Sequence, residues 1–139
     1  MKINFFITKL FLIFLFLTSN AHANKSSYFL EAKKLFEKSD FEKSKFLFEK
    51  DIVFNPKSEI SYLYLAKIFN KNENVEEEEI NLNNVLLLNP KNDEALYMLI
   101  LIKIKQSDYE GVEKLIKQFT LVCNNFCSKK DEIKNKFNK

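Results

Sequence analysis

The sequence has few of the residues that carry catalysis and bind metals. Its only histidine is His22, and it contains no tryptophan and no arginine. Histidine is the usual general acid or base near neutral pH and the commonest metal ligand. Without His22, Ser-His-Asp and Cys-His nucleophiles and histidine metal sites are excluded. An enzyme would then need a pocket of carboxylates or lysines, which the pattern does not show. The sequence therefore predicts a protein that is not an enzyme, with no cofactor and no metal.

Glycine and proline are also scarce, since Gly111, Pro56 and Pro90 are the only ones in the chain. A β fold with many tight turns needs more of both residues, whereas helices tolerate their absence. The sequence therefore predicts an all-α fold.

The first 23 residues are typical of a secretory signal. Met1-Lys2 gives a basic start, Leu10 to Leu17 is wholly apolar, and Ala21-His22-Ala23 is a small-residue cleavage site. The apolar run is shorter than the about 20 residues of a good membrane-spanning helix. We expect cleavage after Ala23 and a periplasmic protein. The alternative is an uncleaved segment that tethers the domain to the inner membrane, facing the periplasm.

The charge of the remaining chain is close to balanced. Cleavage leaves 116 residues, enough for one domain, and lowers the net charge from +3 to +1, because two lysines and no acid are removed. No concentrated basic run remains, and binding to nucleic acid needs such a patch. We therefore predict no nucleic-acid partner, and membrane contact only through an uncleaved N-terminal segment.

The residue pattern repeats every 34 positions. Asn55-Pro56-Lys57 recurs as Asn89-Pro90-Lys91, and short polar residues recur at Asp40, Asn74 and Asp108. A fixed period of this length marks an array of units, each of which buries its apolar face against the next. The side chains of the three short polar residues are suited to cap helix N-termini.

The caps divide the chain into helices. Ser58, Asn92 and Asn24 are further candidate N-caps. A last helix is expected from Ser128 to the end, with Ser128 and Asp131 as its capping box. The other six helices are expected at residues 25–38, 41–54, 59–71, 75–88, 93–106 and 109–122.

Side chains recur at fixed places within each unit. At these places the chain resembles the tetratricopeptide repeat family, whose motif alternates large, small and aromatic residues over two helices and closes on proline. The resemblance covers residues 25 to 126. The matching positions are Tyr28, Glu31, Ala32, Leu35, Ser44, Phe48, Asp51 and Pro56 in the first repeat; Tyr62, Leu65, Ala66, Phe69, Glu78, Leu82, Val85 and Pro90 in the second; and Leu96, Leu99, Ile100, Lys103, Val112, Ile116, Phe119 and Asn124 in the third.

The resemblance implies an α-solenoid of three helix pairs over residues 24–126 and a C-terminal capping helix over residues 127–139. Four charged residues depart from it, because the family prefers packing residues at Glu31, Asp51, Glu78 and Lys103.

The resemblance also implies a binding groove. Members of the family usually bind proteins or peptides in a concave groove lined by the first helix of each repeat. Apolar side chains there would anchor an extended segment, and lysines would pair with its carboxylates. Two alternatives stay open: the lysines form a solvated face while the last helix or a second copy fills the groove, or the protein is a self-associating subunit of the envelope. The implied groove residues are Phe29, Lys33, Phe36, Glu37, Leu63, Lys67, Asn70, Lys71, Tyr97, Leu101, Ile104 and Lys105.

Two further runs have a structural and a functional interpretation. Leu96 to Ile102 is apolar throughout, which favours a central helix buried in the stack; alternatively, part of it faces a partner or another copy of the chain. Glu76 to Glu79 resembles a metal-binding cluster. Consecutive helix residues point in different directions, so these four carboxylates cannot converge on one ion. We expect a solvated helix start.

Cys123 and Cys127 are the only cysteines. They are two ligands short of a closed zinc site, and their spacing differs from Cys-x-x-Cys. In an exported protein such a pair should oxidise, which predicts a structural disulfide that fixes the turn before the last helix. A cysteine pair that joins the last repeat to a closing helix also resembles the arrangement in small exported repeat proteins of proteobacteria.

The last helix has one apolar stripe, formed by Ile133 and Phe137. A terminal cap needs one apolar and one polar face. The alternative is a basic tail for membrane or nucleic acid, but Asp131 and Glu132 dilute its lysines.

Overall fold

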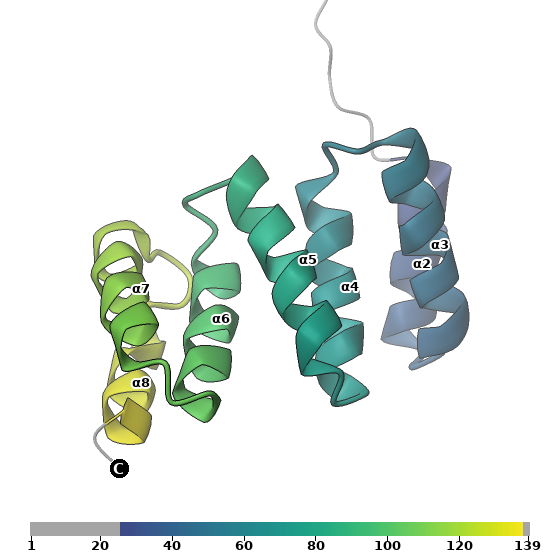
Figure 1. The fold of residues 1–139 in the computed structure, drawn as a ribbon. Helices are drawn as coiled ribbons and strands as arrows, with labels where there is room; N and C mark the ends of the chain where they lie inside the picture. The colour runs from purple at the N-terminus through teal and green to yellow at the C-terminus, as the bar shows by residue number, and fades with distance from the viewer. Residues whose placement is uncertain (1–25, 138–139) are drawn as a thin grey trace, which may run out of the picture.

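The computed structural model describes residues 26–137, which form an array of helix pairs with no strand in that range (Figure 1). The predicted all-α solenoid is confirmed, and the bounds agree within about two residues. The signal segment, the cleavage site at Ala23 and the Asn24 cap lie outside the described residues. The helices are α2 (Ser27–Glu37), α3 (Phe41–Phe54), α4 (Glu59–Lys71), α5 (Val75–Leu88), α6 (Asp93–Lys105), α7 (Tyr109–Val122) and α8 (Lys130–Phe137), preceded by the 3-10 turn η1 (Cys127–Lys129).

Most helix starts are capped as predicted. The side chains of Asp40, Asn74, Asn92 and Asp108 each accept a hydrogen bond from the backbone N–H three residues further on. Ser58 makes no such bond, because its hydroxyl lies 2.9 Å from the Ser61 hydroxyl instead.

The last helix differs from its prediction. It begins at Lys130 and not at Ser128, because Cys127–Lys129 wind as η1 first. The first helix is capped by Ser26, whose hydroxyl oxygen accepts from the N–H of Phe29.

Each helix pair is packed against the next. In α4, Leu65 and Ile68 lie in a buried cluster with Phe48 of the first repeat, while Leu63 and Ala66 lie in a second cluster with residues of α5 and α6. One helix thus supplies two cores. Burial of this kind is what makes each repeat depend on its neighbour.

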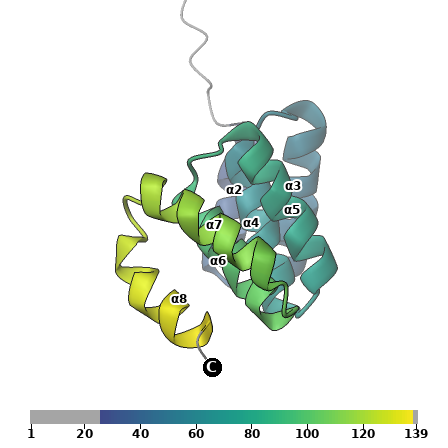
Figure 2. The same cartoon turned by 60° about the vertical axis from the view of Figure 1, so that its left-hand side comes forward.

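The third core is closed by α8. Ile133 is buried against Leu96, Ile100 and Phe119, so α8 covers the apolar side that α6 and α7 would otherwise expose (Figure 2). None of the helices between Ser26 and Phe137 is long and apolar enough to cross a membrane.

The structure explains why the charged residue Asp51 stands at a packing position of the repeat motif. Its carboxylate is fully buried and accepts hydrogen bonds from the hydroxyls of Ser26 and Ser61. A buried carboxylate without partners is strongly unfavourable, but here both oxygens are satisfied. Because Ser61 belongs to α4, the polar group joins the first repeat to the second.

We predict that Asp51→Ala lowers the free energy of unfolding by about 1–3 kcal/mol, because the buried Ser61 hydroxyl and the partly buried Ser26 hydroxyl lose their acceptor. Glu49→Ala is the matched control: it removes a carboxylate from the same helix, but the Glu49 side chain is half exposed and we expect a change within about 0.5 kcal/mol. Urea unfolding followed by circular dichroism measures both. Equal losses in the two variants would show that the buried network contributes no special stability.

Candidate functional site

A groove of about 680 Å³ lies mainly along the helices α4 and α6. Phe36 at the end of α2, Glu78 of α5 and Lys136 of α8 complete its lining. Eight of the predicted residues line it: Phe36, Lys67, Asn70, Lys71, Tyr97, Leu101, Ile104 and Lys105. Five lining residues were not predicted: Glu78, Glu94, Met98, Ile102 and Lys136.

Four predicted residues lie elsewhere. Phe29 and Leu63 are 2% and 3% exposed and belong to the core, so their assignment as groove contacts was wrong. Lys33 and Glu37 do not line the groove and form an ion pair with each other along α2, 3.6 Å apart. The first repeat therefore contributes only Phe36, near the end of α2.

Lys67 is not a solvated lysine. Its ammonium lies 2.8 Å from the carboxylate of Glu94, each side chain is 26% exposed, and the ammonium also lies 5.1 Å from the centre of the Tyr64 ring. The pair joins α4 to α6 across the groove. A partner carboxylate at Lys67 would have to compete with Glu94.

Two residues of the acidic run at the start of α5 contact the neighbouring helices α4 and α6. Glu78 is 3% exposed and accepts hydrogen bonds from the amide of Asn70 at 3.0 and 3.1 Å. Burial raises the pKa of Glu78, while the Asn70 hydrogen bond and the charge of Lys105 oppose that rise. Glu79 pairs with Lys103, 2.5 Å away. The expected solvated helix start was therefore wrong for these two residues, which are tied to neighbouring helices.

The apolar run of α6 has two faces. Leu96, Leu99, Ile100 and Ile102 are buried in the stack, as the first interpretation expected. Tyr97, Met98, Leu101 and Ile104 are partly exposed and line the groove. The buried interpretation is confirmed for one side of the helix, and that the other side faces a partner stays a prediction.

The groove also has basic residues at its margin. Lys71 lies over the Phe41 ring, 5.2 Å from its centre, and Lys105 forms no ion pair within residues 26–137. Lys136 of α8 lies 3.6 Å from Glu132. Lys71 and Lys105 are therefore the groove cations best placed to bind a carboxylate of another molecule.

α8 borders the groove without filling it. The Tyr97 hydroxyl donates to the Glu132 carboxylate at 2.8 Å, and Lys129 pairs with the same carboxylate at 2.9 Å. Burial, together with Glu132, raises the pKa of Tyr97. These contacts tie the last helix to a side chain of the groove wall, so the position of α8 helps to set the shape of the groove.

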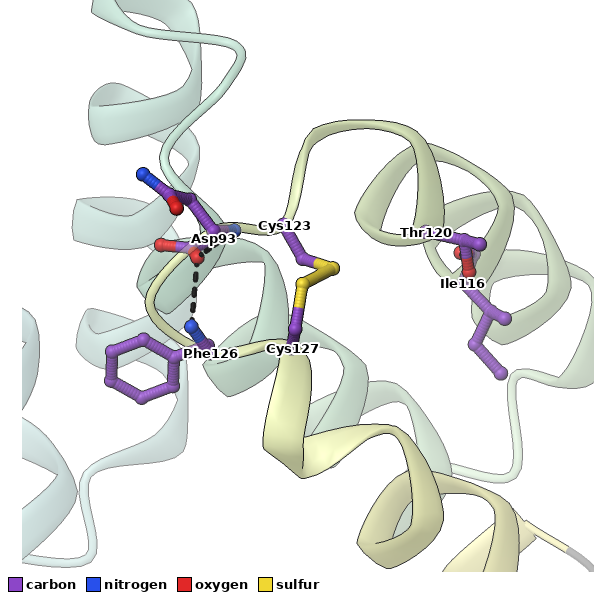
Figure 3. Close-up of a disulfide and its surroundings, with 7 residues drawn as sticks. Asp93, Ile116, Thr120, Cys123, Phe126 and Cys127 are labelled. Atoms are coloured by element: carbon purple, nitrogen blue, oxygen red, sulfur yellow. Dashed lines mark hydrogen bonds between the residues drawn. A yellow bond between two sulfur atoms is a disulfide. The ribbon is translucent and has the colours of Figure 1, made fainter.

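The turn before α8 is held in two ways (Figure 3). The sulfur atoms of Cys123 and Cys127 lie 2.15 Å apart, at disulfide distance. The Asp93 carboxylate accepts hydrogen bonds from the backbone N–H groups of Asn124 and Phe126, at 2.7 and 2.9 Å. Burial alone would raise the pKa of Asp93, but these bonds outweigh it and the pKa is lowered. Sequence reasoning identified the cysteines but missed Asp93.

We predict that Cys123→Ser with Cys127→Ser lowers stability by roughly 2 kcal/mol and leaves the fold helical, because the cross-linked loop is short and Asp93 still holds the turn. Adding Asp93→Asn should cost about 1 kcal/mol more at pH 7, since the two backbone N–H groups would then donate to a neutral amide oxygen and not to a charged carboxylate. A carboxyl group whose pKa is lowered by folding stabilises the protein at a pH above its pKa in the unfolded chain. That stabilisation is lost as the pH falls through its pKa in the folded protein. This additional loss should therefore shrink below about pH 4.

Urea unfolding at pH 7 and pH 3.5 measures these effects, and alkylation without reduction reports whether the cysteines are oxidised. A disulfide leaves both cysteines unlabelled. If the Asp93→Asn loss is the same at both pH values, the carboxylate charge does not hold the turn.

No family model and no curated protein sequence matches the chain. Several solved structures do match the chain. A chain of a CopN-Scc3 complex is 14% identical, with a TM-score of 0.64, over 80% of this chain and 65% of that one. The Sgt2 TPR domain from Aspergillus fumigatus is 15% identical, with a TM-score of 0.63, over 80% of this chain and 72% of that one. At this level of identity the likeness shows the fold, and the chain has the fold of tetratricopeptide repeat domains.

Proposed function

We propose that the protein is a scaffold that binds an extended segment of a partner protein in the groove and carries out no catalysis. The observation that carries this proposal is the groove itself, which combines partly exposed apolar side chains with lysines on the first helices of consecutive repeats. A concave site that sets charged groups beside apolar ones is suited to holding a peptide in one orientation.

The apolar part of the groove would supply the anchors. Tyr97, Leu101 and Ile104 of α6 lie beside Met98, and Phe36 of α2 lines the same groove. Aromatic side chains give much contact area for little loss of conformational entropy, and methionine adapts to irregular shapes. A partner segment with one or two large apolar side chains would fit this surface.

The lysines would select the charge of the segment. Lys67 is already paired with Glu94, so its contribution is largely internal. Lys71 and Lys105 end α4 and α6 and are exposed. Complementary charge raises the association rate and favours the correct partner more than it adds raw affinity. We therefore propose that the bound segment carries carboxylates next to its apolar residues.

Two further points support a protein partner and an exported location. One structural neighbour was solved within a complex named for two proteins, CopN and Scc3. The N-terminal pattern ending at Ala23 is that of an export signal. We propose a periplasmic protein, with the inner-membrane-tethered form as the alternative.

We predict that Lys71→Glu with Lys105→Glu abolishes or greatly weakens capture of the partner, because repulsion replaces attraction at the groove margin. Both side chains are exposed, so stability should change by less than about 1 kcal/mol for each substitution. Lys114→Glu with Lys117→Glu on α7 is the matched control, with the same change of charge on exposed residues outside the groove.

A photoreactive residue in place of Leu101 measures capture in the producing cell, and mass spectrometry identifies the crosslinked protein. The product should disappear in the groove variant and persist in the control. If both variants give the same product, or if a photoreactive residue at Phe46 on the outer side of α3 gives it equally, the groove is not the binding face. A product that is a second copy of the chain would support the self-associating alternative.

A further inference from the structure

Three exposed apolar side chains recur at the repeat spacing. Val53, Leu87 and Leu121 are each 34 residues apart, are the penultimate residues of α3, α5 and α7, and are 75%, 80% and 86% exposed. Single exposed apolar residues are ordinary, but a row of them over adjacent elements indicates an interaction surface. In a solenoid, equivalent positions of successive repeats form one continuous row.

The row is widened by the residues that follow it. Phe54 and Leu88 end α3 and α5 and are also exposed. Figure 1 shows that α3, α5 and α7 all end on the upper side of the molecule. We call the surface formed by Val53, Phe54, Leu87, Leu88 and Leu121 the helix-end edge.

The charge beside the helix-end edge is positive. Lys57 and Lys91 are exposed in the turns that follow α3 and α5, and they too are 34 residues apart. The nearby carboxylates are engaged internally: Asp51 and Asp93 are buried, and Glu59 accepts hydrogen bonds from Asn89 and Asn92 at 3.0 and 2.6 Å. Apolar side chains flanked by lysines are typical of a surface that contacts anionic lipid.

The chain also enters the fold at this edge. The Ser26 hydroxyl donates to Asp51 near the end of α3, and the Tyr28 ring stacks on Phe54 with ring centres 5.6 Å apart.

We infer that the helix-end edge rests on an anionic lipid bilayer, with its apolar side chains at the boundary between headgroups and acyl chains and with Lys57 and Lys91 beside lipid phosphates. A second copy is the less favourable occupant, because a symmetric contact would bring the same lysines together. The groove cations Lys71 and Lys105 lie at the opposite ends of their helices, so a partner could bind while the edge is on the membrane.

The absence of tryptophan allows a direct test with single introduced tryptophans in the full chain. Leu87→Trp places the probe on the edge, and Glu110→Trp places an exposed control near the start of α7, at the other end of the repeat. Vesicles contain phosphatidylglycerol with phosphatidylcholine, or phosphatidylcholine alone, with brominated acyl chains as quenchers. The N-terminal residues are identical in both variants, so a difference between the probes reports the edge.

With phosphatidylglycerol we expect the emission of Leu87→Trp to move to shorter wavelength and to lose about half its intensity to the bromines, as for a side chain at the acyl boundary. The emission of Glu110→Trp should change little. Adding Lys57→Glu and Lys91→Glu to Leu87→Trp should largely abolish the quenching, whereas adding Lys71→Glu and Lys105→Glu in the groove should leave it unchanged. Edge binding and groove binding can therefore fail independently.

Three results would overturn the inference. The two probes could be quenched equally, which would show that only the N-terminal segment meets the lipid. The Leu87→Trp emission could stay unchanged in anionic vesicles. It could also shift with protein concentration before vesicles are added, which would identify a second copy as the occupant of the edge.

Discussion

No helix pair within residues 26–137 buries its apolar residues alone, and the rest of the described structure follows from that constraint. Tyr64 shows it at one position: its ring stacks on Phe48 at 4.9 Å and meets Phe36 edge-on at 5.0 Å, so one residue of the second repeat completes the core of the first. Stability in such an array depends on the contacts between neighbours. The two ends of the array therefore need their own closure.

Two buried carboxylates hold segments of the array together. Asp51 binds Ser26, which caps α2, and Ser61 of α4, and so joins the first repeat to the second. At the C-terminal end, Asp93 holds the turn before α8, and Ile133 covers the last core. Because α8 also binds Tyr97 in the groove wall, closing the array and shaping the groove are linked.

The period of 34 made the helices and four of the caps predictable from sequence, because these features depend on local pattern. The groove residues were implied by the resemblance to the repeat family, and eight of the twelve line the groove. The pairs Lys67–Glu94 and Asn70–Glu78 could not be found, since they depend on how neighbouring helices are rotated in the packed array. Phe29 was misplaced for the same reason. Its motif position implied the groove, but the packing of α2 turns it into the core.

Met98 offers the most direct probe of whether the partner binds in the groove. The chain contains two methionines, Met1 and Met98, and Met98 lines the groove. Selective carbon-13 labelling of methionine methyl groups therefore places one NMR signal in the site. Titration with the partner identified by crosslinking should shift or broaden the Met98 signal until it saturates. A complex that forms by light scattering while the Met98 signal keeps its position and width would show that the partner does not bind in the groove.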